Sequence, residues 1–368
     1  MTTVLAMDHA VLFERLSALV AVESPSGHVE GLEGCYALMR SWGEPLLGRP
    51  AEIVTVSGTP HLLWRASAEG GVLLLGHADT VWPLGTIARR PFRAEGGRAY
   101  GPGVFDMKAG LVTAFAALAG CRDPGLVSIL ITGDEEIGSP TSRALVEEMA
   151  GACEAVLVLE PSQAGALKTA RKGGAFYSVE ITGRAAHAGL EPERGVNALL
   201  ELAAQVVAVS ELADPERGTT VTPTVAHAGT ATNTVPARAH LRVDVRAWQL
   251  AELARVDGRL RALAPTLPGA VVRVDGEINR PPLEPASSRE LYAAARKAAA
   301  HLGLPDPGEV AVGGASDANF TGALGIPTLD GLGPLGDGAH AEHEWVDLAS
   351  LADRARLVAA LIDALTRA

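Results

Sequence analysis

The sequence predicts an α/β fold in which a mostly parallel sheet forms a discontinuous first domain, with a smaller α+β domain inserted into it. Three observations predict this class. Short runs of Val, Leu and Ile without polar alternation, typical of strands buried on both faces, alternate with segments of helical period. This pattern changes near the middle of the chain and returns toward its end. A length of 368 residues also exceeds the usual size of one hydrophobic core.

The elements of the first domain follow in chain order. The segment before residue 25 has an amphipathic helical pattern, without the basic start and cleavage site of a signal peptide. Helical composition and period recur in "MKAGLVTAFAALAG" and "SRALVEEMAGA". Because strands alternate with helices, we expect a mostly parallel sheet. The predicted buried strands are residues 71–80, 126–136 and 155–162.

The inserted domain begins at about Lys172, where the pattern changes. "GAFYSVEITGRAAHAG" alternates like a half-exposed strand, and a helix, two strands, a second helix and a further strand follow. This order is a β-α-β-β-α-β unit. After Pro281 and Pro282 the helical segment "SSRELYAAARKAAAHLG" and the apolar run "IPTLDGLGP" resume the first pattern. The predicted boundaries are residues 1–171 and 284–368 for the first domain and 172–283 for the insert.

The charge and composition exclude several classes of partner. A net charge of −12 without a Lys/Arg-rich block argues against nucleic acid and against an anionic membrane surface. No apolar run reaches the roughly eighteen residues of a membrane span. Three cysteines, an odd number without a CxxC pair, fit a reducing compartment. We therefore expect a cytoplasmic protein whose thiols (Cys35, Cys121, Cys153) carry no chemistry.

Polar side chains follow the apolar runs where the predicted strands end. "GHADT" contains His77 and Asp79, "GDEEIGS" contains Glu135 and Glu136, and "LEPS" contains Glu160. In open α/β sheets, the carboxyl ends of the strands form the ligand-binding edge. Consecutive acids at such an edge repel one another unless cations neutralise them. Imidazole and carboxylate are suitable zinc ligands, and two-zinc sites commonly share a bridging carboxylate.

The sequence therefore offers a candidate site for two Zn²⁺ ions, although Co²⁺ or Mn²⁺ would bind the same residue types. If the acid in "GPGVFDMKAG" bridges, each ion also takes one His and one Glu. The candidate ligands are His77, Asp106, Glu136, Glu160 and His340.

Three neighbouring acids are not among the candidate ligands, and we expect other roles for them. Glu135 is the acid left over, and it is the candidate general base. Asp79 is placed to hold the second nitrogen of the His77 imidazole. Asp134 is expected to cap the following helix or to face solvent. Taken singly, the motifs have simpler explanations: "GDEE" as a helix N-terminus that favours acids, and Glu160 as an ion-paired rim residue.

These motifs together resemble the M20 family of metallopeptidases, which includes glutamate carboxypeptidases, aminoacylases, acetylornithine deacetylases and succinyl-diaminopimelate desuccinylases. "GHADTV", "GPGVFDMKAGL", "GDEEIGS", "LEPS", "GRAAHAG", "GASDANF" and "AHAEHEWV" occur in the family's order over nearly the whole chain. The resemblance implies a catalytic zinc-peptidase domain and an inserted lid domain that commonly forms a homodimer. The ligands that it implies are His77, Asp106 and Glu160 for one zinc, and Asp106, Glu136 and His340 for the other.

The resemblance also assigns residues around the metals. It implies that Glu135 is the general base, that the peptide bond after Asp106 is cis, and that His343 is a surface histidine. His187 in "GRAAHAG" would polarise the scissile carbonyl, often from the neighbouring subunit. A donor to a developing oxyanion can be worth about 3 kcal/mol. A polar residue at a strand-to-loop junction is the alternative for His187.

Three more residues resemble positions that bind substrate. Asn233 in "ATNTVPA" and Arg280 in "EINRPPL" resemble contacts to the substrate carboxylate, for which Arg supplies a planar fork. A turn Asn and a solvated Arg are the alternatives. Lys168 resembles a position that contacts the glutamate side chain in the glutamate-carboxypeptidase-like branch. An exposed strand lysine is its alternative.

The implied reaction is hydrolysis of an amide bond. We expect release of a C-terminal amino acid, glutamate in the first place, from a peptide or N-acyl amino acid with a free carboxylate. The alternatives are an N-acyl amino acid deacylase of the acetylornithine deacetylase or desuccinylase type and a non-catalytic ligand-binding homologue. No nucleic-acid or membrane partner is expected.

Overall fold

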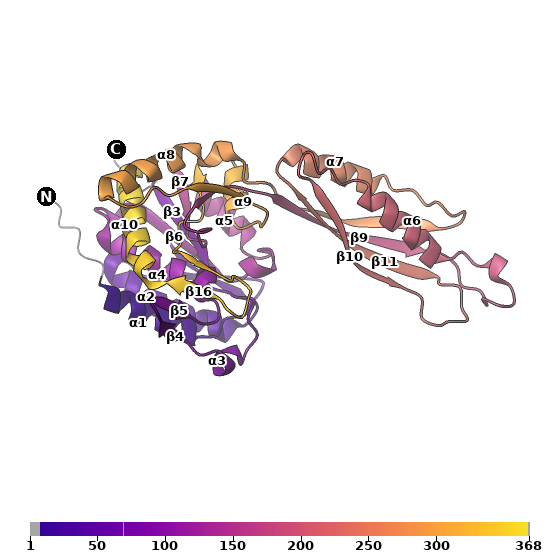
Figure 1. The fold of residues 1–368 in the computed structure, drawn as a ribbon, viewed down its shortest axis with the longest axis horizontal. Helices are drawn as coiled ribbons and strands as arrows, with labels where there is room; N and C mark the ends of the chain where they lie inside the picture. The colour runs from indigo at the N-terminus through magenta and orange to yellow at the C-terminus, as the bar shows by residue number, and fades with distance from the viewer. Residues whose placement is uncertain (1–7, 69, 367–368) are drawn as a thin grey trace. The chain divides into compact units, whose positions relative to one another are not determined.

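The structure is a computed structural model that describes residues 8–68 and 70–366. The described chain divides into two compact units (Figure 1). Arg171–Leu283 and Gly313–Ala315 form the second unit, and the rest of the chain forms the first. Residues 1–7 of the predicted N-terminal helix lie outside the described residues. The helix α1 begins at His9, after Asp8, whose side chain accepts a hydrogen bond from the backbone N–H of Ala10.

A six-stranded sheet is the centre of the first unit. Four of its strands are parallel, and the first two form an antiparallel hairpin at one edge. The three predicted buried strands are β3, β6 and β7, and every residue in them is buried. The predicted mostly parallel sheet is confirmed. In order across the sheet, the strands are β1 (Glu52–Val56), β2 (Thr59–Trp64), β6 (Val127–Thr132), β3 (Val72–His77), β7 (Ala155–Val158) and β14 (Thr328–Leu329).

Helices pack on both sides of this sheet (Figure 1). One group of helices packs around α4, and α4 itself is buried along most of its length. Gly110 in α4 lies against the main chain just before Glu160, because an added Cβ there would be 2.0 Å from the Leu159 carbonyl oxygen. Glycine thus lets α4 begin directly against the strand end that carries Glu160. The helices are α1 (His9–Ala21), α2 (Val29–Leu47), α3 (Thr86–Arg89), α4 (Ala109–Gly120), α5 (Arg143–Gly151), α8 (Pro285–Leu302), α9 (Ala318–Ala323) and α10 (Leu348–Leu365).

Several short elements were not predicted from the sequence. They are strands of two to five residues, one π-helical turn and three 3₁₀ turns. Two small sheets bring distant loops together. These elements are β4 (Arg93–Glu95), β5 (Arg98–Tyr100), β15 (Gly336–Asp337), β16 (Trp345–Asp347), β8 (Leu167–Arg171), β13 (Glu309–Val312), η1 (Val104–Lys108), η2 (Pro124–Leu126), η3 (Glu135–Ile137) and η4 (Pro192–Arg194).

The second unit has the predicted β-α-β-β-α-β order. Its two central strands, β9 and β11, alternate buried residues with half-buried or exposed ones, because two helices cover only one face of the four-stranded antiparallel sheet. Tyr177 in β9 donates its hydroxyl to Asp257 in α7 at 2.8 Å, which ties the central strand to a helix. Across the sheet the strands are β10 (Thr220–Ala228), β11 (Arg238–Ala247), β9 (Gly173–Thr182) and β12 (Val271–Arg280), and the helices are α6 (Ala198–Ser210) and α7 (Leu250–Arg261).

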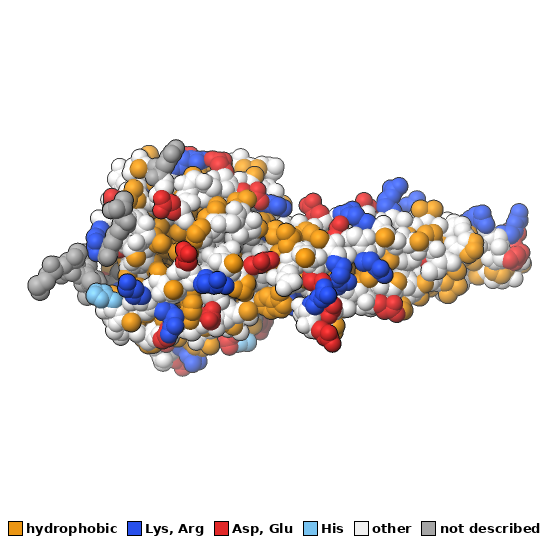
Figure 2. All heavy atoms as spheres, turned by 90° about the horizontal axis from the view of Figure 1, so that it is seen from above, with side chains coloured by type: hydrophobic (Ala, Val, Ile, Leu, Met, Phe, Trp, Pro, Cys, Tyr) orange, Lys and Arg blue, Asp and Glu red, His pale blue; other side chains and the backbone are white. Residues whose placement is uncertain are grey.

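The surface carries charges of both signs. On the face shown in Figure 2, Lys and Arg side chains are interspersed with Asp and Glu and form no single basic patch. This distribution is unlike the basic footprint of a nucleic-acid-binding surface. Within residues 8–68 and 70–366, no helix combines the length and the apolar character that a membrane crossing requires.

Candidate metal centre

The sheet brings the predicted ligands together at one edge. His77 is the last residue of β3, Glu136 lies in η3 after β6, and Glu160 follows β7. Because β3, β6 and β7 run parallel, their carboxyl ends meet at this edge. Asp106 comes from η1, and His340 comes from the loop between β15 and β16.

The distances place Asp106 between the two histidines. The Nε2 atom of His77 is 3.4 Å from Asp106 Oδ1 and 3.4 Å from Glu160 Oε1. The Nε2 atom of His340 is 3.1 Å from Glu136 Oε2 and 3.5 Å from Asp106 Oδ2. Each oxygen of Asp106 therefore faces one imidazole. The structure brings all five predicted ligands into one cluster.

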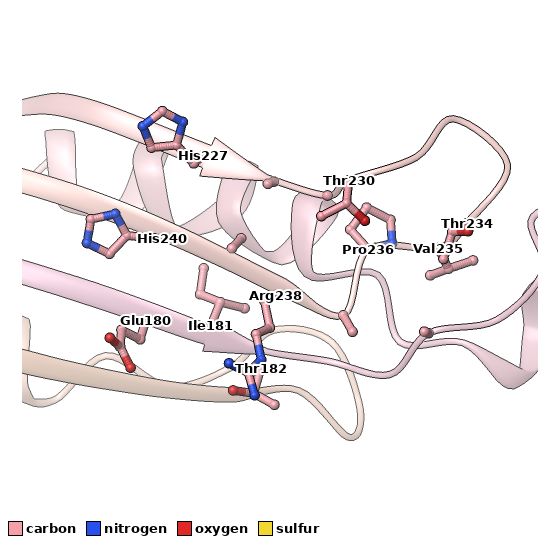
Figure 3. Close-up of a pocket in the computed structure, with 15 residues that line it drawn as sticks. Glu180, Ile181, Thr182, His227, Thr230, Thr234, Val235, Pro236, Arg238 and His240 are labelled. Atoms are coloured by element: carbon pink, nitrogen blue, oxygen red, sulfur yellow. The ribbon is translucent and has the colours of Figure 1, made fainter.

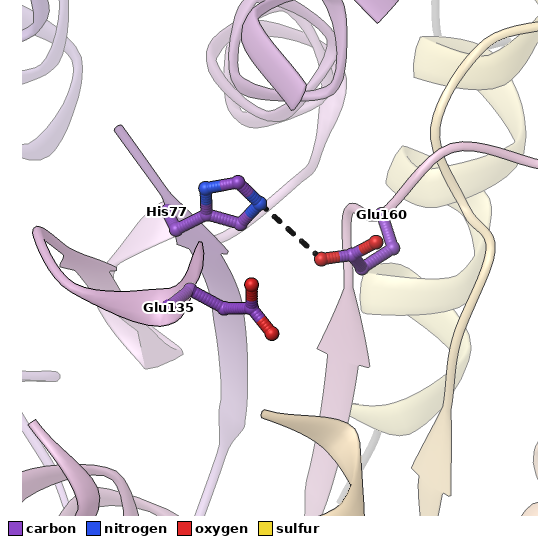
Figure 4. A group of neighbouring side chains, drawn as sticks. All are labelled: His77, Glu135 and Glu160. Atoms are coloured by element: carbon purple, nitrogen blue, oxygen red, sulfur yellow. Dashed lines mark ion pairs between the residues drawn. The ribbon is translucent and has the colours of Figure 1, made fainter. Parts of the chain in front are cut away.

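Glu135 points into the same space. Its carboxylate lies beside His77 and Glu160 (Figure 4), and one donor atom from each of these three residues lies within 4.8 Å of the others. One donor atom each from His77, Asp106 and Glu136 meets the same limit. The side chain expected to be the base is thus within reach of the predicted ligands.

The donor set fits divalent metal ions. Ligand atoms about 2.1 Å from one tetrahedral ion lie roughly 3.4 Å from each other, as His77 Nε2 does from Asp106 and Glu160. This separation is long for a hydrogen bond. Asp106 Oδ1 and Glu136 Oε1 are buried, and neither has a hydrogen-bond partner among the described residues. Such buried, unpaired carboxylate oxygens are accounted for if they bind cations.

The pKa values of the clustered side chains also favour a site for cations. Burial disfavours the charged form of His77, but the nearby carboxylates of Asp106, Asp79 and Glu160, each 3.4 Å from a ring nitrogen, raise its pKa well above the usual value. The hydrogen bond with Glu136 raises the pKa of His340 to about 9. Burial raises the pKa of Glu136, and its hydrogen bond with His340 opposes the change. Protons on His77 and His340 therefore supply positive charge that a bound metal ion would otherwise bring.

Asp79 differs in detail from the prediction. The Nδ1 atom of His77 is 2.9 Å from the backbone carbonyl oxygen of Asp79 and 3.4 Å from its carboxylate. The Asp79 carboxylate instead accepts hydrogen bonds from the backbone N–H groups of Glu135 and Glu136, each at 3.1 Å, and from the Ser26 hydroxyl at 2.6 Å. Asp79 thus orients the imidazole through its carbonyl and holds the η3 turn through its side chain.

Asp134 is buried and does not face solvent. Its Oδ2 accepts from the Thr141 N–H and hydroxyl, each at 2.7 Å, and from the Ser142 N–H at 3.3 Å. These groups immediately precede α5, so Asp134 holds the segment that leads into that helix. Its side chain forms no capping hydrogen bond with η3 or α5, so the structure matches neither of the two expectations for Asp134.

Sequence reasoning missed Glu344, a fully buried acid in the His340 loop. Its Oε1 accepts from the backbone N–H groups of Phe105 and Asp106 at 2.9 and 3.0 Å. Its Oε2 accepts from the Gly103 N–H at 2.8 Å and the Trp82 indole at 3.0 Å. Glu344 therefore fixes the loop that presents Asp106. "AHAEHEW" shows an acid there, but three of the four hydrogen-bond donors to it are backbone N–H groups, which leave no sequence signal.

Three other expectations near the cluster can be compared with the structure. The Asp106–Met107 peptide bond is cis, as expected. His343 is exposed, as expected. Lys168 is not an exposed strand lysine, because its side chain is 12% exposed and its Nζ lies 4.0 Å from Glu160 Oε2.

The second unit brings two of the predicted substrate residues together. The Ala188 N–H, next to His187, donates to the backbone carbonyl of Asn233 at 2.9 Å. Both His187 and Asn233 are exposed. The adjacent Thr234 lines a cavity of about 640 Å³, whose wall also carries His227 and His240 (Figure 3).

Arg280 lies at the opposite end of the same sheet. It pairs with Gly174 at the start of β9, whereas His187 follows the end of β9 at Thr182. A strand from Gly174 to Thr182 rises roughly 25 Å. Arg280 is 6% exposed, so it is not a solvated surface arginine. Within one chain, the unit therefore does not bring Arg280 next to His187 and Asn233.

Comparison with known proteins identifies the family. The family described as "Peptidase family M20/M25/M40" matches residues 73–364. Carboxypeptidase G2 of Pseudomonas sp. (strain RS-16) is 32% identical, with 96% of this chain and 89% of that protein covered. The chain belongs to the M20 peptidase family. This M20 metallopeptidase is also 31% identical to succinyl-diaminopimelate desuccinylase of Caulobacter vibrioides (strain NA1000 / CB15N), with 81% of this chain and 82% of that protein covered.

A solved structure of low identity shares the fold. The Bacillus subtilis YXEP protein, described as a dinuclear metal binding peptidase from the M20 family, aligns with a TM-score of 0.63 and 17% identity. The alignment covers 97% of this chain and 98% of that chain. Family membership and the donor cluster together support a metal cofactor for this M20 metallopeptidase.

Glu344→Gln should weaken metal binding without unfolding the protein. The amide presents an NH₂ group toward backbone N–H donors, so the Asp106 loop loses part of its support. Loss of such a supporting contact typically costs about 10–100-fold in metal affinity, which a competition titration with a chelator would measure. Exposed Glu342→Gln is the matched control. Unchanged affinity in Glu344→Gln would contradict this role.

Metal binding should release protons near neutral pH. The folded-state pKa of His340 is about 9, above the ordinary value of 6.5. Protonated His340 therefore stabilises the metal-free protein below about pH 6.5, and this contribution disappears as pH rises through about 9. Because metal competes with that proton, affinity should increase over the same interval. Calorimetry in buffers of different ionisation enthalpy tests this, and binding at pH 7.5 without proton release would contradict it.

Proposed function

We propose that this M20 metallopeptidase is a zinc-dependent amide hydrolase that releases a C-terminal amino acid, glutamate in the first place, from a peptide or N-acyl amino acid. One observation carries the proposal: Asp106 offers one carboxylate oxygen to each histidine, with Glu135 beside the same cluster. The similarity to carboxypeptidase G2 over nearly the whole chain supports the type of bond and product. We also propose a cytoplasmic location, which the three free cysteines support.

The proposed ligands are divided between two zinc ions. His77, Asp106 and Glu160 would hold one ion, and Asp106, Glu136 and His340 would hold the other. When bound, the ions would lower the pKa of a water molecule and polarise the substrate carbonyl. Co²⁺ or Mn²⁺ would suit the same oxygen and nitrogen donors.

Glu135 is proposed as the general base and acid. Its backbone N–H is held by the Asp79 carboxylate at 3.1 Å, so the turn that carries it is fixed. Its side chain is 8% exposed, which shelters proton transfer from bulk water. Glu135 would take a proton from the attacking water and pass it to the leaving nitrogen.

His187 is proposed to donate a hydrogen bond to the scissile carbonyl. Its Nδ1 accepts from the backbone N–H groups of Gly189 and Leu190 at 3.2 and 3.1 Å. A neutral imidazole that accepts at Nδ1 carries its proton at Nε2. Nε2 is therefore the donor that a developing oxyanion requires.

We propose that Lys168, Arg280 and Asn233 contact the carboxylates of the substrate. Lys168 would contact the side-chain carboxylate of a released glutamate, because it already lies beside Glu160. Arg280, whose guanidinium forms a planar fork, and Asn233 would contact the terminal carboxylate.

We propose a homodimer in which His187 and Asn233 serve the active site of the partner chain. The support comes from within the second unit, where Arg280 and His187 lie at opposite ends of β9. One copy of this unit does not bring both to one small substrate, whereas two copies related by a twofold axis would supply one from each.

An N-acyl amino acid deacylase is the second candidate. The 31% identity to a succinyl-diaminopimelate desuccinylase favours it. The two candidates differ in which part of the substrate determines specificity: the released amino acid in a carboxypeptidase, or the acyl group in a deacylase.

Glu135→Gln should abolish turnover while retaining the metals. General acid–base catalysis contributes about 10²–10⁴-fold, so kcat should fall by at least that range. Glu136→Gln is the matched comparison, because loss of a proposed ligand should lower metal content as well. Metal analysis beside kinetics separates the two variants. Full activity in Glu135→Gln would remove the base assignment.

Lys168→Met should raise KM selectively for substrates that release glutamate. A charge-assisted contact is worth about 1.5–3 kcal/mol, which corresponds to a loss of roughly 10–100-fold. Peptidyl and N-acyl glutamates would be compared with the matching glutamine substrates, acyl-ornithine, acyl-arginine and succinyl-diaminopimelate. Preference for acyl-ornithine or succinyl-diaminopimelate would favour the deacylase instead.

Mixing two inactive variants should restore activity if His187 acts across a dimer. Subunits of His187→Ala and Glu135→Gln, unfolded and refolded together, would form mixed dimers with one complete site. Random pairing predicts roughly a quarter of the original activity. The same variants refolded separately and then assayed together provide the control. No recovery in a confirmed dimer would place His187 and Glu135 in sites of the same chain.

A further inference from the structure

A second cavity lies in the first unit and includes none of the proposed metal ligands. It has a volume of about 410 Å³, within the range of roughly 300–1,000 Å³ typical of small-molecule sites. Its walls come from the turn between β7 and β8, the segment after α8 and the first half of α10. Apolar side chains form much of the lining, among them Leu304, Pro305, Leu335 and Leu357.

Arg354 supplies positive charge to this cavity, whose lining also includes Asp306, Asp347 and Asp353. It lies on α10, lines the cavity and is 6% exposed. Its Nη2 donates to the backbone carbonyl of Gly165. Among residues 8–68 and 70–366, no carboxylate forms an ion pair with its guanidinium. Burial lowers the pKa of Arg354 to about 10, as expected when a charged group is removed from water without a counter-ion.

The acids nearest the cavity already have partners. Asp353 pairs with Arg356 at 3.4 Å, and Asp306 pairs with Arg296 at 2.6 Å. Asp347 accepts from the Ser350 backbone N–H at 2.9 Å at the start of α10. The charge of Asp353 opposes part of the effect of burial on the pKa of Arg354, but among the described residues none of the three acids forms an ion pair with its guanidinium.

We propose that this cavity binds a small organic carboxylate, with its carboxyl group on Arg354 and its apolar body against Leu304, Pro305 and Leu357. The guanidinium fork matches the two oxygens of a carboxylate. Pairing offsets the cost of the buried charge, and the apolar wall favours a compact hydrocarbon body over a hydrated inorganic ion. The site is separate from the substrate carboxylates considered above, so it does not depend on the proposed reaction.

Benzoate is the probe, with its neutral isostere benzamide and inorganic phosphate as comparisons. Titration of the metal-loaded full chain by calorimetry and ligand-observed NMR should show binding of benzoate. Arg354→Met should weaken it by about tenfold or more, the loss typical of a charge-assisted pair. Exposed Arg356→Met, on the same helix, should bind like the original chain.

A second variant tests the proposal independently in case Arg354→Met does not fold. Leu335 is 37% exposed, so Leu335→Trp should fill the cavity with little effect on the core, and it should abolish benzoate binding. Benzoate held only by metal ions would be lost on chelation but retained in both variants, and that result would overturn the proposal. Binding of benzamide equal to that of benzoate, or binding of phosphate alone, would overturn the carboxylate assignment.

Discussion

Mutual repulsion among buried carboxylates at one edge of the sheet is the constraint on which the rest of the site depends. Asp79, Asp106, Glu135, Glu136 and Glu160 converge there because three parallel strands end together. Backbone N–H groups offset the charge of Asp79, and imidazoles offset part of the charge of Asp106, Glu136 and Glu160. The remaining unpaired oxygens call for cations. Function and fold are therefore linked, since the cations that would relieve the repulsion are also the groups proposed to activate the substrate and water.

The sequence predicted the features that depend on composition and period. Continuous apolar runs identified β3, β6 and β7, and alternation identified the antiparallel unit, because burial on both faces or on one face leaves these patterns. The gathering of His77, Glu136 and Glu160 followed from strand ends in a parallel sheet, whereas Asp106 and His340 come from η1 and from the loop between β15 and β16. The β1–β2 hairpin was not predicted, because β1 is largely exposed and β2 includes Pro60 and His61, so neither is a continuous apolar run. The strands of two or three residues near the site were not predicted, because so few residues show no period. The side-chain contacts of Asp79 and Glu344 were missed because their partners are backbone N–H groups, which every residue has.

In the second unit, the candidate substrate-binding residues lie at opposite ends of strand β9. At one end of β9, backbone donors fix the tautomer of His187 beside Asn233, and at the other end Arg280 is buried. Residue types alone suggested a shared role in binding substrate. The register of the sheet adds that, in one copy, these groups belong to opposite ends of a strand that is roughly 25 Å long. The sequence motifs thus indicated which residues could bind substrate. The strand pairing indicated which of these residues one chain can bring to the same substrate.

Glu344 has a further consequence for how the protein is made. Its carboxylate holds the N–H of Asp106, although 238 residues separate the two in the chain. On a ribosome, the central strands emerge long before the segment that steadies the Asp106 loop. A nascent chain therefore carries its crowded acids without this support until Glu344 itself has been synthesised. We therefore expect full metal loading only after the His340 loop has emerged, because fragments that end before this loop would lack both a proposed ligand and the anchor of the proposed bridging one.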